Sequence, residues 1–151
     1  MRISWDRYFL DVANLTSQLS TCMRKQVGAC LVRDHRIISL GVNGSPSKMP
    51  HCSDVGCQIE DEHCVRCIHA EMNAILQCAI HGISPVGSTL YCTYTPCFEC
   101  AKVLIQAGIT KIVFEKVYDQ KVCAYLRSSI LLEKIDDLTS EKTSLRELQY
   151  G

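Results

Sequence analysis

The sequence lacks the features that would place the protein in a membrane or outside the cell. No apolar run among its 151 residues approaches the roughly 18 residues that a membrane-spanning helix needs. The first residues, 1–6, contain no apolar core of the kind found in secretory signals. We therefore expect a cytoplasmic protein with no membrane partner. The length suits one domain, and we expect residues 1–151 to form it.

An excess of charge of one sign is also missing. Sixteen lysines and arginines balance sixteen aspartates and glutamates, and no stretch concentrates the basic residues. Proteins that bind a nucleic-acid backbone usually carry a basic face, because release of counterions from the phosphates drives that binding. A small anionic metabolite needs only one or two local cations. The charge balance thus favours a metabolite over a nucleic acid as the ligand.

Cysteine, in contrast, is plentiful, with eleven residues. Disulfide frameworks are typical of small secreted domains. Here the number of cysteines is odd, a secretory signal is missing, and several cysteines lie beside histidines. Reduced thiols that bind metal explain this pattern better. Four further cysteines fall within expected strands or helices, where we expect them to be buried as small apolar side chains: Cys30, Cys78, Cys92 and Cys123.

Hydrophobic periodicity and capping residues divide most of the chain into helices and strands. We predict helices over residues 4–20, from about 69 to a cap at 82, from 96 to an end at 108, and over 120–134. We predict strands over residues 27–32, 36–42, 88–93 and 110–115. An opening hairpin followed by alternating strands and helices predicts the α/β fold class, with a mixed sheet covered by helices.

Two segments of this pattern need separate comment. In the first helix, apolar residues recur along one face, which predicts its packed side: Trp5, Phe9, Val12, Leu15 and Leu19. Residues 43–67 show no periodicity and are rich in Gly, Ser, Pro, His and Cys. A loop of this length inside a compact domain is usually functional or fixed by an additional interaction.

Two short motifs carry the chemistry, His-Ala-Glu at 69–71 and Pro-Cys-Phe-Glu-Cys at 96–100. Their pairing, H-x-E with P-C-x-x-C, is the pattern of zinc nucleobase deaminases. His69, Cys97 and Cys100 would supply three ligands and leave the fourth tetrahedral position to water, as in catalytic zinc sites. Both motifs begin predicted helices, whose N-termini favour thiolates over thiols. Zinc would lower the pKa of its water toward about 7.

Glu71 lies two residues after the histidine and suits the role of proton carrier. It would take a proton from water, deliver it to ring N3 and help protonate the departing ammonia. The alternative is a structural zinc knuckle in a binding module without catalysis, where Glu71 would be dispensable. The two motifs and both helix starts together favour the catalytic interpretation.

The chain resembles the deoxycytidylate (dCMP) deaminase family, including its bacterial and phage members, from about Trp5 to Tyr118. The segments that carry the resemblance are residues 27–29, 41–46, 69–75, 96–102 and 106–109. The zinc motifs alone also occur in cytidine, guanine, riboflavin-pathway and tRNA deaminases. The Asn-Gly-Ser-Pro loop, the long Cys/His segment and the Ile-Gln-Ala-Gly-Ile stretch are more specific to dCMP deaminases.

The resemblance implies a cytidine-deaminase-like three-layer fold, with a mixed five-stranded sheet flanked by helices. It implies conversion of dCMP to dUMP, which feeds thymidylate synthesis. It further implies a homohexamer activated by dCTP and inhibited by dTTP, with Mg²⁺ accompanying a triphosphate effector. Other substrates stay open at this point, namely dCTP, cytidine and tRNA adenosine. Basic patches would favour tRNA, and the sequence has none.

The resemblance also implies substrate contacts. Asn43 matches the position whose amide binds the nucleoside sugar, although Asn-Gly is also a common turn pair. Arg24 and Tyr118 are candidates for the 5′-phosphate, since a guanidinium suits phosphate through its forked donors. The alternatives are a solvated surface arginine and a core tyrosine.

Some members of the family carry a second, structural zinc. Matching their positions gives four ligands: Cys22, Cys52, His63 and Cys67. One imidazole and three thiolates would form a closed tetrahedral site that holds the long loop. Cys57 and Cys64 are rival ligands. The alternative is a set of free cysteines packed as small apolar side chains.

Overall fold

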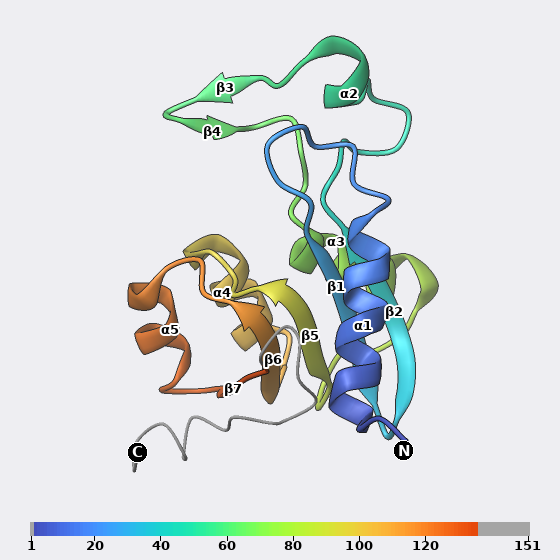
Figure 1. Ribbon diagram of the computed structural model, residues 1–151, viewed down its shortest axis with the longest axis vertical. Coiled ribbons are helices and arrows are strands. Elements are labelled where there is room, and N and C mark those ends of the chain that lie inside the picture. The colour runs from blue at the N-terminus through green and yellow to red at the C-terminus, as the bar shows by residue number, and fades with distance from the viewer. Residues whose placement is uncertain (1, 136–151) are drawn as a thin grey trace.

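The computed structural model describes residues 2–135, which form a five-stranded sheet between two layers of helices (Figure 1). The helices are α1 (Trp5–Ser17), α2 (Cys52–Val55), α3 (Ala70–His81), α4 (Phe98–Gln106) and α5 (Gln120–Leu126). The sheet strands are β1 (Gly28–Arg33), β2 (Arg36–Val42), β5 (Thr89–Tyr94), β6 (Lys111–Lys116) and β7 (Leu131–Lys134). Strands β3 (Ile59–Glu60) and β4 (His63–Cys64) form a separate hairpin.

Alternation along the strands creates two cores, one on each face of the sheet. On one face, Cys30 and Tyr91 pack against Phe9, Leu10 and other residues of α1. Leu31, Cys92 and Phe114 are among the residues that pack against α3, α4 and α5 on the opposite face. The α/β three-layer fold expected from the resemblance is therefore confirmed. The four cysteines expected in the core are buried as well, at 0–1% exposure.

The sheet is mixed and runs in the order β2-β1-β5-β6-β7. Strand β1 pairs antiparallel with β2 and β5, while β5, β6 and β7 run parallel. Helix α4 follows β5 and helix α5 follows β6, so their N-termini lie at the carboxyl edge of the parallel strands. Ligand sites of α/β sheets are usually found at this edge.

A glycine brings α3 onto the sheet at the same end. A Cβ atom on Gly41 would stand 2.0 Å from the backbone oxygen of Ala70 and 2.6 Å from the nitrogen of Ala74. Backbone atoms cannot move aside as a flexible side chain can, so any larger residue would push the helix away from β2. Gly41 therefore determines how closely the first turn of α3, where the His-Ala-Glu motif lies, approaches β2.

The predicted helix over residues 120–134 is wrong in its second half. Helix α5 ends at Leu126, and Leu131–Lys134 is strand β7, which pairs parallel with β6. Leu132 and Ile135 are buried while Leu131 is exposed. Backbone bonds from Leu131 to Thr110 and from Ile135 to Phe114 continue the ladder. Tertiary pairing with β6 thus prevails over the apolar spacing that suggested a helix.

The predicted packed face of the first helix is also partly wrong. Phe9 is buried, but Trp5 and Leu15 are 49% and 67% exposed, and Leu19 lies beyond the helix end at 72%. The buried side consists of Asp6, Phe9, Leu10, Ala13 and Thr16. At Ala13 the backbone of the helix lies against Gly28 of β1, because a Cβ on Gly28 would lie 1.9 Å from the Ala13 backbone oxygen.

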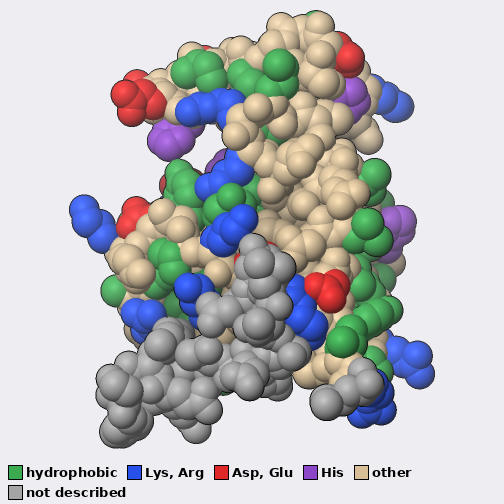
Figure 2. All heavy atoms as spheres, viewed as in Figure 1, with side chains coloured by type: hydrophobic (Ala, Val, Ile, Leu, Met, Phe, Trp, Pro, Cys, Tyr) green, Lys and Arg blue, Asp and Glu red, His purple; other side chains and the backbone are tan. Residues whose placement is uncertain are grey.

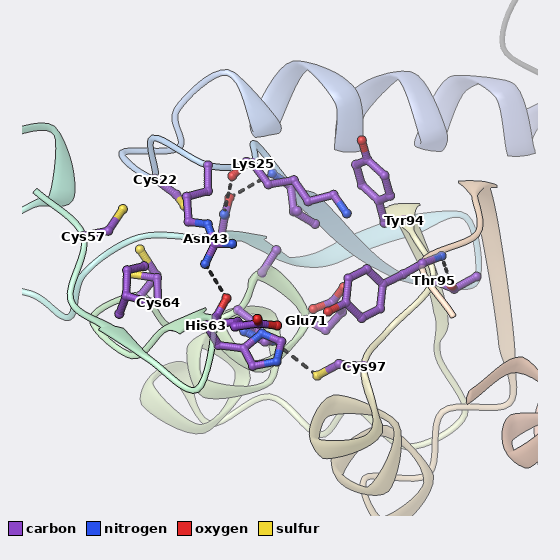
Figure 3. A pocket seen from close by; sticks show the side chains of 18 residues that line it. Cys22, Lys25, Asn43, Cys57, His63, Cys64, Glu71, Tyr94, Thr95 and Cys97 are labelled. Carbon is purple, nitrogen blue, oxygen red and sulfur yellow. Dashed lines mark hydrogen bonds between the residues drawn. The ribbon is translucent and has the colours of Figure 1, made fainter. Parts of the chain in front are cut away.

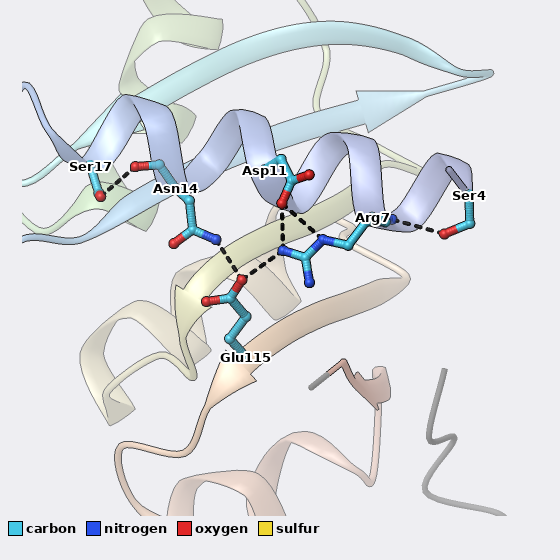
Figure 4. A network of polar contacts seen from close by, with 6 residues as sticks. All are labelled: Ser4, Arg7, Asp11, Asn14, Ser17 and Glu115. Atoms are coloured by element: carbon cyan, nitrogen blue, oxygen red, sulfur yellow. Dashed lines mark hydrogen bonds and ion pairs between the residues drawn. The ribbon is translucent and has the colours of Figure 1, made fainter. Parts of the chain in front are cut away.

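Polar contacts also hold α1 on the sheet. The carboxylate of Glu115 on β6 is almost fully buried and accepts hydrogen bonds from Arg7 Nη2, at 2.8 Å, and from Asn14 Nδ2 (Figure 4). Arg7 also pairs with Asp11 one turn along the helix. On the same helix, Asp6 accepts a hydrogen bond from the Tyr91 hydroxyl at 2.7 Å. These bonds fix α1, whose end leads into the segment that borders the site. Among residues 2–135, no helix has the length and apolarity needed to cross a bilayer.

Candidate active site

A cavity of about 960 Å³ opens between the body of the molecule and the lobe that contains α2, β3 and β4. Figure 2 shows the hollow below this lobe, with Lys and Arg side chains at its edge. Both sequence motifs reach the cavity: His69 and Glu71 line it from the start of α3, and Cys97 lines it from the start of α4.

The structure brings His69, Cys97 and Cys100 together. The Nδ1 atom of His69 lies 3.4 Å from the Cys97 sulfur and 3.5 Å from the Cys100 sulfur. The ligand atoms of these three residues all lie within 4.8 Å of one another. His69 and Cys97 are the N-caps of α3 and α4, and Cys100 is in the first turn of α4. The two helix starts, which sequence analysis predicts, thus produce one compact set of metal-binding atoms.

The electrostatics of this set favour a thiolate. A hydrogen bond with the Cys100 thiol, supported by His69, lowers the pKa of Cys97 to about 4. The hydrogen bond to Cys97 in turn raises the pKa of His69, against the effect of its own burial. The N-terminus of α4 adds partial positive charge beside both sulfur atoms. A deprotonated sulfur near an imidazole is the donor chemistry that zinc prefers.

Glu71 is placed for proton transfer. Only 5% of the residue is exposed, and it lines the cavity together with His69 and Cys97. Burial raises the pKa of the Glu71 carboxyl, partly offset by its own backbone N–H and by His69. A carboxyl group whose pKa is raised in this way accepts a proton more readily near neutral pH. Its position and environment suit a group that takes up and returns protons.

The remaining predicted substrate contacts also line the cavity: Arg24, Asn43 and Tyr118. Asn43 is 7% exposed, and its side chain donates to the Lys25 oxygen at 2.6 Å and accepts from the Val27 nitrogen at 2.8 Å. Arg24 donates to the backbone oxygen of Glu62 at 2.7 Å, in the turn of the β3–β4 hairpin. These bonds add structural roles to both residues, and their substrate roles stay predictions.

Sequence analysis missed Lys25 and Tyr94 in the cavity wall. The Lys25 ammonium lies 3.7 Å from the centroid of the Tyr94 ring, and both residues line the cavity (Figure 3). No pattern identifies a single lysine between a helix and a strand. Tyr94 ends β5 just before the second motif, and that neighbourhood is the one signal that could have indicated it.

A second cluster of cysteines lies in the lobe. The Cys52 sulfur is 3.6 Å from that of Cys64 and 3.5 Å from that of Cys67. Within residues 2–135, two groups of three or more His, Cys, Asp or Glu side chains have ligand atoms that all lie within 4.8 Å of one another. One is this triad, and the other consists of His69, Cys97 and Cys100. The predicted ligands Cys22 and His63 belong to neither group.

A register difference of one residue explains the exchange of His63 for Cys64. Successive side chains of a strand point to opposite sides, and on β4 the sulfur of Cys64 points to the cluster while His63 is exposed. Cys57 lies near the cluster: burial first, and then Cys52 and Cys64, raise the pKa of its thiol to about 11. The structure therefore gathers Cys52 and Cys67 as expected and adds the two rivals, with Cys22 close enough to influence Cys67 electrostatically.

Comparison with known proteins now becomes informative. A family model described as cytidine and deoxycytidylate deaminase zinc-binding region matches residues 3–116. The chain belongs to this family. It is 49% identical over 117 residues to ComE operon protein 2 of Bacillus subtilis, covering 78% of this chain and 62% of that protein. It is 38% identical over 126 residues to the deoxycytidylate deaminase of Saccharomyces cerevisiae, covering 78% of this chain and 39% of that enzyme.

Among solved structures, the dCMP deaminase of cyanophage S-TIM5 in complex with dCMP and dUMP is similar over the whole fold. It gives a TM-score of 0.80 at 33% identity, covering 89% of this chain and 99% of that one. The chain spans less than two thirds of the length of the two curated relatives above. The family to which the chain belongs is thus that of the zinc-binding cytidine and deoxycytidylate deaminases.

Proposed function

We propose that this family member hydrolyses dCMP to dUMP and ammonia. The observation that carries the proposal is the buried Glu71 carboxyl beside His69, Cys97 and Cys100, at the wall of a cavity large enough for a nucleotide. The resemblance to deoxycytidylate deaminases, and the structural similarity to one that binds dCMP and dUMP, support this choice of substrate.

The donor set fits zinc. One imidazole nitrogen and two thiols within 4.8 Å of one another form a tripod of the kind that catalytic zinc sites use. We propose that His69, Cys97 and Cys100 hold the ion. When bound, zinc supplies the activation of a water molecule at neutral pH.

Glu71 performs the proton transfers. It takes a proton from the water that attacks C4 of the cytosine and delivers it to ring N3. Glu71 then takes the second proton from the hydroxyl now attached to C4 and delivers it to the exocyclic nitrogen. The bond from C4 to nitrogen breaks, ammonia leaves and C4 becomes a carbonyl. The raised pKa of Glu71 supports this assignment, because the group has to hold and release protons in turn.

We place recognition of the sugar and the phosphate at other residues that line the same cavity. We assign the sugar contact to Asn43, whose amide is fixed by its bonds to Lys25 and Val27. Tyr118 and Arg24 stay candidates for the phosphate end. Hexameric assembly, activation by dCTP with Mg²⁺, inhibition by dTTP, a single domain over 1–151 and a cytoplasmic location stay predictions.

The second cluster suits a structural zinc. We propose that Cys52, Cys64 and Cys67 supply three thiolates, with Cys57 as the fourth ligand, because Cys57 lies near Cys52 and Cys64. Cys22 and His63, the two ligands expected from the resemblance that lie outside the triad, are the alternatives for this position. Zinc contents of Cys57→Ser, Cys22→Ser and His63→Ala proteins would distinguish the three.

A substrate panel tests the proposed function. Ammonia release should be fastest from dCMP, with slower release from deoxycytidine, cytidine and dCTP and none from tRNA. A preference for cytidine or dCTP would change the substrate while retaining the reaction. Zinc-loaded protein that releases ammonia from none of them would contradict the proposal and favour a binding module.

A further inference from the structure

Lys25 occupies a distinctive position in the cavity wall. Its ammonium lies over two phenol rings, 3.7 Å from the centroid of Tyr94 and 4.7 Å from the centroid of Tyr118. The three residues come from separate parts of the chain: the segment before β1, the end of β5 and the segment after β6. All three line the cavity that contains Glu71. Figure 3 shows Lys25 and Tyr94 in its wall. The ring faces attract the ammonium and so place a cation in the wall of this cavity.

The surroundings hold this group in place. The backbone oxygen of Lys25 accepts a hydrogen bond from Asn43 Nδ2 at 2.6 Å. The backbone nitrogen of Tyr118 donates to Thr95 Oγ1 at 2.7 Å, and Thr95 is 2% exposed. These bonds to buried side chains fix the backbone at Lys25 and at Tyr118 before a ligand enters. Preorganisation of this kind lowers the entropy lost on binding.

The charge of Lys25 is available to an anion. Within residues 2–135, no carboxylate oxygen lies within the 4.0 Å of an ion pair with its ammonium. Burial lowers the pKa of Lys25, Glu71 acts against this effect, and the positive Lys116 adds to it. Lys116 lies 5.5 Å from the centroid of the Tyr94 ring and reinforces the positive potential. An incoming anion would relieve this repulsion.

Arg24 is in a different situation. It is exposed, and its guanidinium donates to the Glu62 oxygen in the hairpin turn of the lobe. This bond ties the lobe to the segment before β1. An arginine used as a tether is less free to bind substrate than the neighbouring lysine.

We propose that Lys25, held between Tyr94 and Tyr118, binds the 5′-phosphate of the substrate and sets the preference for nucleotide over nucleoside, while Arg24 serves as the tether of the β3–β4 hairpin. This inference rests on the proposed function, since it concerns the same cavity. The phosphate would take the ammonium donors that the rings leave open.

The test compares kcat/KM for dCMP with kcat/KM for deoxycytidine in matched variants. Lys25→Met removes the charge and keeps the length of the chain. It should reduce the dCMP/deoxycytidine ratio by at least about tenfold, the effect of losing one charge-assisted contact. Lys25→Arg should retain more of the ratio than Lys25→Met. Lys121→Met, an exposed lysine outside the cavity, should leave the ratio at the wild-type value.

A binding measurement separates this inference from the proposed function. Calorimetry with dUMP and deoxyuridine needs no turnover, and wild type should bind dUMP more tightly, with Lys25→Met losing that advantage. This result would support Lys25 even if no substrate were deaminated. An unchanged dCMP ratio and an unchanged dUMP advantage in Lys25→Met would overturn the inference, as would a larger loss of both in Arg24→Met.

Discussion

The two cysteine clusters use the same chemical groups in opposite structural settings. His69, Cys97 and Cys100 are placed by two helix starts that rest on the sheet, one of them held in position by Gly41. Cys52, Cys64 and Cys67 lie in the lobe, which consists of one short helix, a hairpin of two strands with two residues each, and connecting loops. Figure 1 shows this lobe standing away from the layered body.

The two settings differ in whether packing of the fold or the metal itself brings the ligands together. In the body, hydrophobic packing positions the ligands, so the fold precedes the metal. In the lobe, several apolar side chains are exposed, among them Val55, Ile59 and Val65 at about half of their surface, so packing supplies little. A metal there contributes folding free energy directly, because an unfolded segment does not hold its ligands together. Under the proposed function, one cluster thus serves chemistry and the other serves shape.

The largest expected effect is at the catalytic cluster. Glu71→Gln preserves the shape of the side chain and removes its ability to carry protons. Turnover should fall by about 10²–10⁴-fold or more, since general acid–base groups contribute that range and this one acts in several transfers. Zinc content and thermal stability should stay near those of the parent. A folded, zinc-containing variant with more than about a tenth of the parent activity would refute the role of Glu71.

The next largest effect is in the lobe. Cys52→Ser should remove one zinc per chain and lower the free energy of unfolding by an amount on the order of several kcal/mol. Activity should fall far less than in Glu71→Gln, to the extent that the lobe misplaces Asn43 and Arg24. Elemental analysis and thermal unfolding measure both quantities. Cys30→Ala, at a buried cysteine outside both clusters, is the control and should keep the zinc content of the parent.

One zinc per chain in the parent, together with parent-like stability of Cys52→Ser, would reduce the lobe cluster to free thiols. It would also remove the distinction between a cluster for shape and a cluster for chemistry.

A smaller effect is expected at the polar contact between α1 and β6. Arg7→Met would leave the carboxylate of Glu115, whose side chain is 3% exposed, without its guanidinium partner. The free energy of unfolding should fall by about 3 kcal/mol, as for other buried pairs that lose one member. Lys102→Met breaks the exposed pair with Glu99 and should lower it by less than about 1 kcal/mol. Chemical denaturation of both variants measures the difference, and equal losses would contradict the importance of this contact.

Local patterns predicted the catalytic cluster because each ligand belongs to a motif that begins a helix. The signals of a helix start are local, and the known pairing of H-x-E with P-C-x-x-C groups His69 with Cys97 and Cys100 without knowledge of the tertiary structure. The strand at Leu131–Lys134 could not be predicted in this way, because its identity depends on pairing with β6. The packed face of α1 includes Ala13, where the backbone of the helix lies against Gly28 of β1. The spacing of apolar residues along the helix does not reveal this contact.

The second cluster shows the limit of matching positions by resemblance. His63 and Cys64 are adjacent in the sequence, and a register difference of one residue decides which of them faces Cys52. Lys25 could not be identified either, because its role depends on two tyrosines from distant segments. Contacts between distant segments that carry no motif can be identified only in the three-dimensional structure.

The most direct test of the central claim is an isotope experiment on the unmodified protein. Zinc-loaded protein incubated with dCMP in water labelled with heavy oxygen should form dUMP that carries one heavy oxygen atom at C4, with one ammonia released for each dUMP. Mass spectrometry of the product provides the measurement. Formation of dUMP without the label, or no dUMP from folded protein that contains zinc at His69, Cys97 and Cys100, would contradict hydrolytic deamination by this site.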